Sequence, residues 1–505
     1  MCFLKRIMCV QPPAVMVALL IAVVAVATSA APPPVIEWFV DPLTVQVPQE
    51  RRAPFASSAK IFDFAEMRGG CERKQLWLWS GEATLQGVKL EVAQESLLPG
   101  SWAYKQQGYV KALPSDLYLC NSNVLANNSA EPAAQCEPGW YPDVLLDVPA
   151  DGIPLVEKGI TQPIMLEVCL ARTATSGNFS GSVLVRGQVA GVEGGTTNFS
   201  FSVPVLLEVW PLTVPALNDS KAFSTTFNFG STGALWGLQH WYPQRSTAAV
   251  WAQWFPFLAR HRIPGDALYT QPDPRPIEEL QALADSGAKH MNLLYGVAVA
   301  NTTELLERLA PTITNLTRLG LLEKAYLYGF DENPQTNATI AAILDRFGRV
   351  KQRWPTLRTH ATLNWPSLDD DWPIDTWINE FGQWGSANHW RDPTPKSEAR
   401  KRWLAAKPGR KFWWYWCFWN EAGAAQHGHD RAALLDTFVE RPVIQSRLMY
   451  WLASLHAVDG MLYYHVNQWV SQCGIGHGAT PNAHARPCTP VRRCASCSRH
   501  HKLRR

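Results

Sequence analysis

Residues 325–334, AYLYGFDENP, say more about the architecture than any other part of the chain. An apolar, β-rich run from Ala325 to Phe330 ends in two adjacent carboxylates, Asp331 and Glu332, and an Asn-Pro pair follows them. In parallel α/β sheets and barrels, ligands meet the C-terminal ends of the strands, so a carboxylate pair at this position predicts an acid/base site. Two like charges this close also predict a raised pKa for one of the groups. The alternative is a turn in which the Asp or the Asn caps the next helix.

Residues 220–470 alternate between short strand-like runs and helical stretches. The strand-like runs lie at 223–230, 265–270, 290–299, 325–330, 359–364, 375–381, 411–419 and 459–469. Helices are predicted over 246–261, 302–320, 338–353 and 434–457. Eight strands alternating with helices over about 250 residues is the count for a (β/α)8 TIM barrel. A doubly wound sheet is the competing architecture, and the lack of a Gly-rich phosphate loop in the sequence weighs against it.

Residues 31–215 show β patterning throughout. Alternating or β-branched runs, separated by Gly, Pro, Asn and Ser, lie at 76–92, 163–171, 181–189 and 199–210. This spacing predicts an antiparallel β-sandwich as the N-terminal domain. The sandwich could bind carbohydrate itself, but we expect a supporting module.

The N-terminus, residues 1–30, has the pattern of a signal peptide. Lys5 and Arg6 precede an apolar run from Ala14 to Ala27, and small residues follow it. The run is shorter than the roughly 20 residues that span a bilayer, which favours cleavage over an uncleaved anchor. We therefore expect a protein that is secreted, or that lies in the endomembrane or lysosomal lumen, with no membrane span after cleavage.

The sequons and the cysteines also fit a protein of the secretory pathway. N-x-S/T sequons occur at Asn127, Asn178, Asn198, Asn218, Asn301, Asn315 and Asn337, a density that predicts a glycoprotein. The cysteines of the sandwich region are Cys71, Cys120, Cys136 and Cys169. They could form two disulfides, and the sequence does not choose among the three possible pairings.

The charge is unevenly distributed. Seven of the 46 basic side chains lie in residues 471–505, which contain no acidic residue. The rest of the chain has 39 basic and 43 acidic side chains, so nothing in it predicts a nucleic-acid partner.

Tryptophan usage in the barrel region favours a sugar site. Of the 23 tryptophans, 17 lie between residues 220 and 470. Indole rings stack on the apolar faces of pyranose rings while the N–H reaches a hydroxyl group. Most of these tryptophans should still be core residues, because Trp413, Trp414 and Trp416 alternate along one predicted strand and cannot all face one pocket.

Several motifs of the chain resemble glycoside hydrolase family 123, the β-N-acetylgalactosaminidases. In the barrel region they are YGFDENP (328–334), IDTW (374–377), KFWWYWCF (411–418) and the segment 438–469. In the sandwich region they are WYPDVLLD (140–147) and SGNFSGSVLV (176–185). The resemblance covers about residues 35–470. It implies an enzyme that removes terminal β-linked N-acetylgalactosamine from glycans or glycolipids.

The family's chemistry is substrate-assisted and retains the anomeric configuration. The 2-acetamido carbonyl attacks C1 and forms an oxazoline, so the enzyme needs no nucleophile of its own. The resemblance assigns Asp331 to hold the acetamido N–H and Glu332 to protonate the leaving oxygen and later deprotonate water. Adjacent residues point to opposite faces of a regular strand, so both can serve only if the chain turns at Phe330–Asp331. The Asn-Pro pair that follows favours such a turn.

The resemblance and the strand ends also predict substrate-binding residues. Those on the last two strand motifs are Trp416, Tyr464, Asn467 and Trp469. Those at other strand ends are Tyr295 and Asn364. We expect a carbohydrate as substrate, no metal and no cofactor, because the barrel region has no convincing cluster of metal ligands.

Two other functions stay open. A β-N-acetylglucosaminidase or hexosaminidase is possible because family 20 enzymes use an Asp-Glu pair with the same assistance. A catalytically inactive, carbohydrate-binding barrel is possible because the chain departs from the family at its end. Family members continue past the last strand motif with a closing helix, whereas residues 471–505 form a basic segment with Cys and His and no apolar periodicity. We expect this tail to be non-native or disordered, and the barrel to lack its C-terminal closing helix.

Overall fold

The computed structural model of this chain describes residues 36–41, 43, 60–81, 83–93, 97–112, 139–190, 195–219, 223–228, 247–269, 272–381, 395–416 and 444–463. The predicted signal peptide (1–30) and basic tail (471–505) lie outside these residues, and so does any helix after the last barrel strand. The described residues up to Val214 form one compact unit, and nearly all of those from Pro215 onwards form a second.

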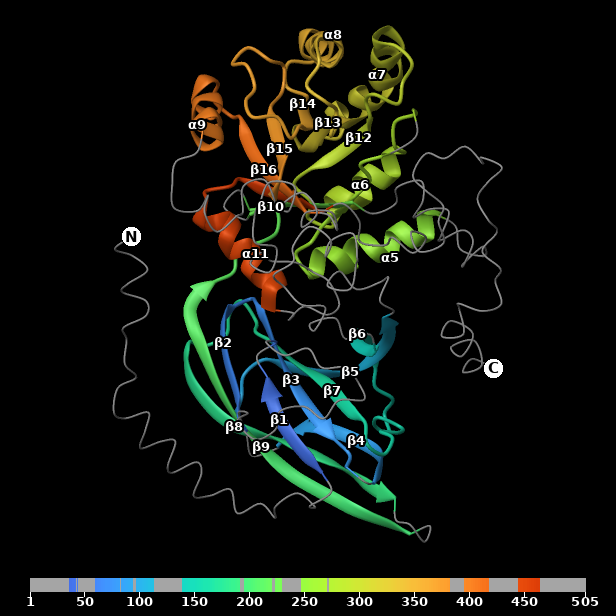
Figure 1. Ribbon diagram of the computed structural model, residues 1–505, viewed down its shortest axis with the longest axis vertical. Coiled ribbons are helices and arrows are strands. Elements are labelled where there is room, and N and C mark those ends of the chain that lie inside the picture. The colour runs from blue at the N-terminus through green and yellow to red at the C-terminus, as the bar shows by residue number, and fades with distance from the viewer. Residues whose placement is uncertain are drawn as a thin grey trace, which may run out of the picture. The chain divides into compact units, whose positions relative to one another are not determined.

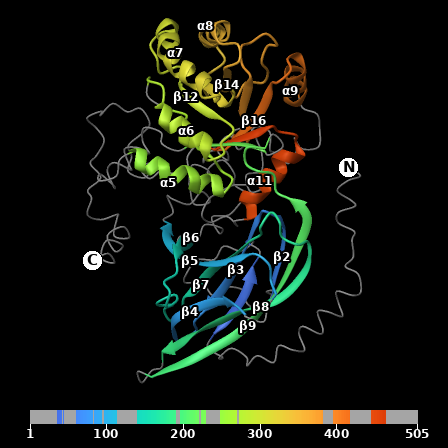
Figure 2. The same ribbon diagram turned by 180° about the vertical axis from the view of Figure 1, so that it is seen from behind.

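The first unit contains two β-sheets (Figure 1). The five-stranded sheet is antiparallel throughout and consists, in spatial order, of β1 (Glu37–Asp41), β3 (Cys71–Trp79), β7 (Thr161–Cys169), β5 (Ser101–Ala112) and β6 (Gly139–Asp147). The four-stranded sheet consists of β2 (Phe62–Arg68), β9 (Thr196–Thr213), β8 (Gly177–Ala190) and β4 (Thr84–Val92). Figure 2 shows the long strands β8 and β9 side by side.

One strand pair departs from the predicted antiparallel sandwich. β2 runs parallel to β9, whereas β9 with β8 and β8 with β4 are antiparallel. β2 and β9 are far apart in the sequence, so no hairpin joins them and the connection does not impose an antiparallel pairing.

The core of the sandwich follows from strand alternation. Every second residue of β9 is buried in its central part, namely Phe199, Phe201, Val203, Val205, Leu207 and Val209. They belong to one apolar cluster with side chains of the other sheet, such as Leu76 and Leu78 of β3. Because successive side chains of a strand point to opposite faces, this pattern fills the space between the two sheets.

The predicted strand run 76–92 is in fact two strands in different sheets. β3 ends at Trp79 and β4 begins at Thr84. Between them, Ser80 is fully buried, its hydroxyl donates to the Glu157 carbonyl oxygen at 2.6 Å, and Gly81 has φ 58°. Glycine adopts this left-handed conformation without a steric penalty, so the chain can change sheets here.

A disulfide links Cys71 and Cys169. The two residues lie directly opposite each other on the antiparallel strands β3 and β7. Cys120 and Cys136, the other cysteines considered for pairing, lie outside the described residues.

The second unit contains eight parallel strands in sequence order. They are β10 (Ser224–Asn228), β11 (Gly265–Asp266), β12 (Met291–Tyr295), β13 (Ala325–Asp331), β14 (Arg358–Thr362), β15 (Thr376–Glu380), β16 (Lys411–Trp416) and β17 (Gly460–Tyr463). Each overlaps one of the eight predicted runs. The last strand, β17, pairs with the first, β10, as a barrel requires.

Among the described residues, the backbone ladder is interrupted only between β11 and β12, and side chains bridge that seam. The Asn292 amide nitrogen donates to the carbonyl oxygens of Ala267 (2.8 Å) and Leu268 (3.0 Å). The Asp266 carboxylate accepts from the Asn292 backbone N–H at 2.9 Å. The buried Arg275 forms an ion pair with Asp266. These polar contacts replace the missing strand pairing, so the barrel is nearly closed.

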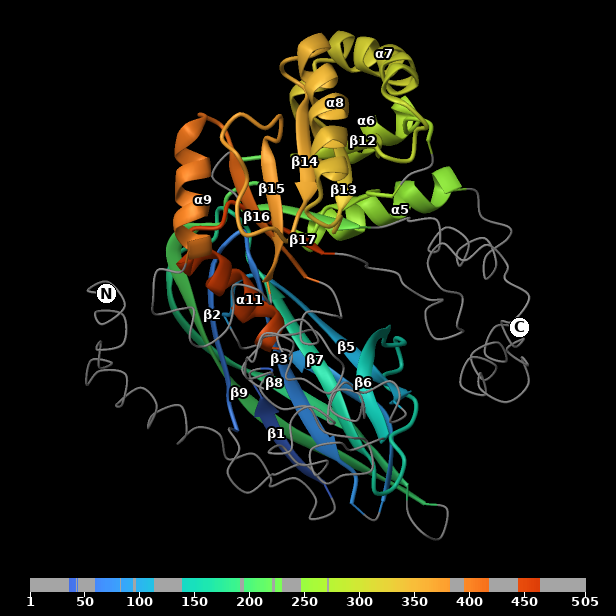
Figure 3. The same cartoon turned by 45° about the horizontal axis from the view of Figure 1, so that its top comes forward.

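Helices flank the strands (Figure 3). Those that the structure describes are α5 (Thr247–Arg260), α6 (Ile277–Asp285), α7 (Thr302–Arg318), α8 (Asn337–Arg353), α9 (Pro395–Ala406) and α11 (Ile444–Leu455), with a short 3₁₀ helix at Leu322–Lys324. α6 and α9 were not predicted. α6 has only nine residues, and the sequence of α9, PKSEARKRWLAA, has no clear apolar stripe. None of the described helices is long and apolar enough to cross a membrane.

The barrel strands separate two apolar layers. On β16, Phe412, Trp414 and Trp416 belong to the large cluster that includes the flanking helices. Trp413 and Tyr415 belong to a smaller cluster with Tyr326, Tyr328, Ile378 and Leu462 of other strands. The smaller cluster fills the barrel interior, in the manner of side-chain layers in TIM barrels.

Candidate functional site

The C-terminal ends of the barrel strands gather polar and aromatic side chains. Asp331 is the last residue of β13, and Tyr295 is the last residue of β12. Asn364 follows β14 by two residues, and Tyr415 lies near the end of β16. The structure therefore brings the predicted Asp331, Glu332, Tyr295 and Asn364 to one end of one barrel.

A β-bulge turns Asp331 into the barrel. Strand alternation would place Tyr326, Tyr328 and Phe330 on one face and Asp331 on the other. The register between β13 and β14 shifts, because Tyr328 pairs with His360 but Asp331 pairs with Thr362, so that β13 holds one extra residue. Phe330 therefore points outwards and packs edge-on against Phe347 of α8, with ring centroids 5.2 Å apart. Asp331 and Tyr328 now share the interior face.

The backbone is strained at this point. Phe330 has φ 59° and Glu332 has φ 53°, in the left-handed region that non-glycine residues rarely adopt. The Glu332 N–H donates to the Thr362 carbonyl oxygen at 2.8 Å and holds this conformation in place. The turn that the sequence required at Phe330–Asp331 is therefore present. Such strain costs about 1–3 kcal/mol per residue and is concentrated at functional sites.

Asp331 is half-buried, and neutral hydroxyl groups hold its carboxylate. Tyr328 donates to Oδ1 at 2.6 Å and Tyr269 donates to Oδ2 at 2.7 Å. Burial raises the pKa of Asp331; the two tyrosines oppose the rise, and the charge of Glu332 adds to it. The raised pKa in this pair is that of Asp331, and burial rather than repulsion from Glu332 is its main cause.

Three tyrosine rings surround Asp331. Tyr269 lies edge-on to Tyr295 and to Tyr328, with centroid distances of 5.5 and 5.9 Å. Burial raises the pKa of Tyr295 to about 12, and the Asp331 charge contributes. Tyr328 also shares a 2.6 Å hydrogen bond with the Thr362 hydroxyl group. Burial also raises the pKa of Tyr328, so Tyr295 and Tyr328 stay protonated near neutral pH and can donate hydrogen bonds.

Glu332 is exposed and lies on a second hydrogen-bond chain. The Tyr415 hydroxyl donates to Glu332 Oε1, and the Asn364 amide nitrogen donates to the Tyr415 oxygen at 2.8 Å. The Glu380 backbone N–H donates to Asn364 Oδ1 at 2.9 Å, which fixes the orientation of the amide. Burial raises the pKa of Tyr415, and the charges of Glu380 and Glu332 raise it further. Tyr415 is therefore a permanent donor that holds one oxygen of Glu332.

The helix after the site does not use the carboxylates as its cap. The N-cap of α8 is Thr336, whose hydroxyl group accepts from the Thr339 N–H at 3.1 Å. The interpretation of Asp331 or Asn333 as the helix cap is therefore wrong. The Asn333 carbonyl oxygen instead accepts from the indole of Trp365 at 2.8 Å, which anchors the loop that follows Glu332.

Trp416 lies on the wrong side of its strand to line this site. It is 1% exposed and stacks on Phe381 with centroids 3.9 Å apart in the outer layer. Its neighbour Tyr415 points inwards instead. The prediction that Trp416 contacts substrate is therefore wrong, since residues of one strand alternate between the two layers. The other predicted binding residues, Tyr464, Asn467 and Trp469, lie outside the described residues.

The part of the chain that the structure describes contains one cluster of potential metal ligands, Cys71, Glu167 and Cys169 in the sandwich. Its two cysteines form the disulfide, so their sulfur atoms are not thiolates that could bind a metal.

Tyr269, Tyr328 and Tyr415 also belong to the site but were not predicted. Alternating patterns in the sequence hinted at Tyr328 and Tyr415, and none pointed to Tyr269. Tyr326 and Tyr328 alternate immediately before the carboxylates, and Tyr415 alternates with Trp414 and Trp416. Alternation alone does not say which face is inside, however, because that depends on the pairing register.

Comparisons with known proteins bear on the fold. No family model matches the sequence, and no curated protein matches it. A solved family 123 glycoside hydrolase from Clostridium perfringens, studied for glycolipid glycan hydrolysis, has a similar structure with a TM-score of 0.58. The match covers 85% of this chain and 78% of that chain at 11% sequence identity. A PapD-like domain of human CEP192 matches 37% of this chain at 11% identity, and its TM-score of 0.17 carries no argument. At such low identities, the likeness to the glycoside hydrolase shows a shared fold.

Proposed function

We propose that this chain is a glycoside hydrolase that removes terminal β-linked N-acetylgalactosamine from glycans or glycolipids. The observation that carries the proposal is the adjacent pair Asp331 and Glu332, which stands on a strained, bulged strand end at the C-terminal end of the barrel. Support also comes from the fold shared with a family 123 glycoside hydrolase and from the sequence motifs that resemble that family.

The proposed mechanism is substrate-assisted and retaining. The 2-acetamido oxygen attacks C1 as the bond from C1 to the leaving oxygen breaks, and Glu332 gives its proton to that oxygen. Asp331 accepts a hydrogen bond from the acetamido N–H and stabilises the positive charge that develops on the oxazolinium ring. In the second half, Glu332 takes a proton from the water that attacks C1, and the acetamido group is restored.

The surroundings of the two carboxylates suit these different tasks. Asp331 is oriented by Tyr328 and Tyr269 within a desolvated site, where a hydrogen bond to a developing charge is stronger than in water. Glu332 is exposed and held through one oxygen by Tyr415, which leaves the other oxygen to face a leaving group and then water. One carboxylate is thus fixed for electrostatic work, and the other is accessible for proton transfer.

Passage through the secretory route belongs to the same proposal. Its support is the N-terminal signal-like segment together with sequon asparagines that are exposed on the folded units, among them Asn178, Asn198, Asn218, Asn301 and Asn337. An N-glycan needs such an exposed position.

The test of substrate and mechanism uses nitrophenyl glycosides and the full chain. Faster release of nitrophenol from the β-N-acetylgalactosaminide than from the β-N-acetylglucosaminide is expected. Preference for the glucosaminide would agree with the proposed mechanism but contradict the proposed specificity for N-acetylgalactosamine. Replacing the N-acetyl group by mono-, di- and trifluoroacetyl groups should lower kcat/KM at each step, because each fluorine weakens the attacking carbonyl oxygen. An unchanged kcat/KM across this series would contradict substrate assistance, and binding without turnover of any glycoside would leave a lectin-like barrel.

A further inference from the structure

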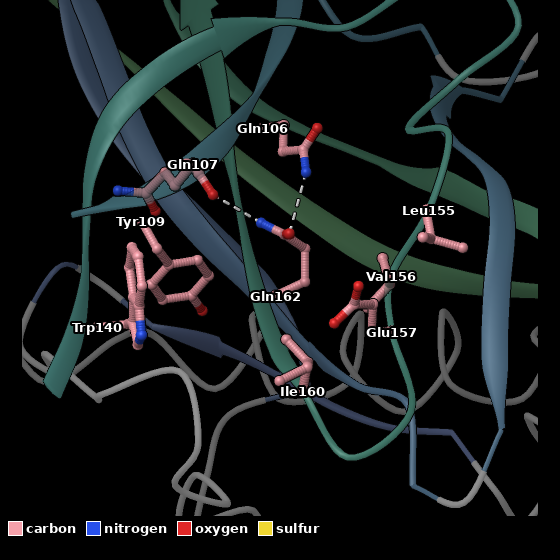
Figure 4. Close-up of a pocket in the computed structure, with 10 residues that line it drawn as sticks. Gln106, Gln107, Tyr109, Trp140, Leu155, Val156, Glu157, Ile160 and Gln162 are labelled. Atoms are coloured by element: carbon pink, nitrogen blue, oxygen red, sulfur yellow. Dashed lines mark hydrogen bonds between the residues drawn. The ribbon is translucent and has the colours of Figure 1, made fainter. Parts of the chain in front are cut away.

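A cavity of about 300 Å³ lies in the sandwich. It is lined by β5, β6, the segment 155–160 and the start of β7. Figure 4 shows the Tyr109 and Trp140 rings on one side of it and Val156 and Glu157 on the other, with Gln162 between them. The cavity belongs to the first unit alone, and the proposed hydrolase chemistry makes no use of it.

The polar floor of this cavity is rigid. Gln162 is 4% exposed, and its amide nitrogen donates to the carbonyl oxygens of Gln107 and Pro163, each at 2.8 Å. Its amide oxygen accepts from the Gln106 amide nitrogen at 3.0 Å. The two glutamine side chains are therefore held in fixed positions before any ligand arrives, which reduces the entropy lost on binding.

The lining defines the chemistry of a fitting ligand. Two aromatic rings offer apolar faces, the Gln106 amide, which Gln162 orients, offers a hydrogen-bonding edge, and Glu157 offers a carboxylate. None of the described residues that line the cavity is a lysine or an arginine, so an anionic ligand would meet the Glu157 carboxylate without a counter-charge from them. A purely apolar ligand would desolvate the Gln106 amide and the Glu157 carboxylate without offering them a hydrogen bond. A pyranose matches all three features, since it has apolar C–H faces and a rim of hydroxyl groups.

We propose that this cavity is a second carbohydrate-binding site, separate from the barrel, which takes a short neutral glycan. The volume lies at the lower end of the ~300–1,000 Å³ that is common for ligand pockets, which suits a short glycan rather than a long chain. A second glycan site would hold the protein on a glycan-covered surface and raise the effective concentration of barrel substrate. The sandwich would then bind sugar itself and would not serve only as a supporting module.

The test measures glycan binding by the full chain carrying Asp331→Asn, which should slow turnover in the barrel by about 10²–10⁴-fold. Methyl β-glycosides of galactose, glucose, mannose and N-acetylgalactosamine serve as probes in saturation-transfer NMR and calorimetry. At least one glycoside should bind, and Trp140→Ala should raise its Kd by ~2–10-fold, the range expected for one aromatic contact. Trp210→Ala, on β9 of the other sheet, is the matched control and should leave the Kd unchanged.

A second variant guards against a folding defect. Glu157 is exposed, so Glu157→Gln should fold normally and should weaken binding of the same glycoside by about tenfold. Turnover of nitrophenyl substrate by Trp140→Ala and Glu157→Gln, made in the chain with Asp331 intact, should equal that of the unmodified chain. The proposal is overturned if no glycoside binds, or if neither Glu157→Gln nor a folded Trp140→Ala changes the Kd, because the bound sugar would then occupy another site.

Discussion

Two aspartates of the barrel interior, Asp266 at the end of β11 and Asp331 at the end of β13, share a raised pKa with burial as its main cause, yet they have different partners. Asp266 accepts from two backbone N–H groups and from Tyr326, and it is paired with the Arg275 guanidinium. Asp331 has two tyrosine hydroxyl donors and a second carboxylate, Glu332, as its sequence neighbour.

The difference separates a structural carboxylate from one prepared for a ligand. Asp266 is surrounded by donors and a counter-charge, and it closes the seam between β11 and β12. Asp331 is held by neutral groups on a strained backbone, so a ligand N–H with partial positive charge would relieve its desolvation. Burial of a carboxylate is therefore no guide to its role until its partners are known.

The largest expected effect is on activity. Asp331→Asn should lower kcat by about 10²–10⁴-fold, because it removes the carboxylate that we propose stabilises the oxazolinium ring. At neutral pH the variant should be at least as stable as the unmodified chain. Burial raises the pKa of Asp331, so the charged carboxylate is unfavourable in the folded protein, and the substitution removes that charge. Urea unfolding and nitrophenol release measure the two quantities, and a large loss of stability with kcat retained would reverse the assignment.

The corresponding substitution at the seam between β11 and β12, Asp266→Asn, should instead lower the free energy of unfolding. Asp266→Asn removes a carboxylate that pairs with the buried Arg275 guanidinium. Arg275→Met leaves the buried Asp266 carboxylate without its cationic partner. Removing one partner of a buried ion pair lowers the free energy of unfolding by about 3–5 kcal/mol. Urea denaturation at pH 7 tests this, and a loss below about 1 kcal/mol for both variants would show that the seam does not depend on the pair.

The opposite end of the barrel interior provides a pH-dependent effect. Burial lowers the pKa of His290 to about 3, and it lowers the pKa of His360 well below the usual value. The nearby charges of Arg358, Lys289, Lys351 and Lys411 act in the same direction. Neither ring nitrogen of His360 has a hydrogen-bond partner among the described residues. Both imidazoles are therefore neutral in the folded protein, where His360 stacks on Tyr326.

These histidines should make the fold sensitive to acid. Below a pH of about 6.5 the two histidines bind protons in the unfolded chain but stay neutral in the folded chain. The free energy of unfolding therefore has its full value above that pH and falls as the pH drops towards 3. The slope should be about 1.4 kcal/mol per pH unit for each histidine. His360→Phe should reduce the slope between pH 5 and 6 by one histidine's share, and an unchanged slope would show that His360 titrates normally.

The smallest effect concerns the hydroxyl group that holds Glu332. Tyr415→Phe removes the donor to Glu332 and the acceptor of the Asn364 amide. We expect about a tenfold decrease in kcat, the value of one lost hydrogen bond to a charged group. We also expect a displaced basic limb of the pH profile of kcat/KM, because the proposed general acid Glu332 must be protonated when the leaving group departs. Tyr104→Phe in the sandwich is the control and should keep both. If Tyr415→Phe keeps kcat and the pH profile, the hydroxyl does not position Glu332.

Local patterns in the sequence predicted the eight strands of the barrel well. Runs such as 290–299 and 411–419 combine apolar and β-branched or aromatic residues, and the structure has a strand in each. The need for a turn at Phe330–Asp331 was also predictable, because two neighbouring carboxylates cannot share one face of a regular strand. α9 was not predictable in this way, because its helix has many charged residues and no apolar stripe.

The strand register and the contacts between residues far apart in the chain could not be predicted from the sequence. The bulge in β13 depends on its pairing with β14, and it decides that Phe330 faces outwards and Asp331 inwards. The same limit explains the error at Trp416, since the alternation of β16 was recognised but its inward face was not. The hydrogen bonds from Tyr269 and Tyr415 to the carboxylates join residues that are far apart in the chain, so no local pattern reveals them.

The most direct test of the central claim is the release of nitrophenol from the β-N-acetylgalactosaminide by the full chain and by its Glu332→Gln variant. Glu307→Gln, an exposed glutamate on α7, is the matched control. The account predicts turnover by the unmodified chain and by Glu307→Gln, and a decrease of at least about 10²-fold in Glu332→Gln with unchanged stability. Equal turnover by Glu332→Gln and the unmodified chain would contradict it, because the proton donor would then be another residue.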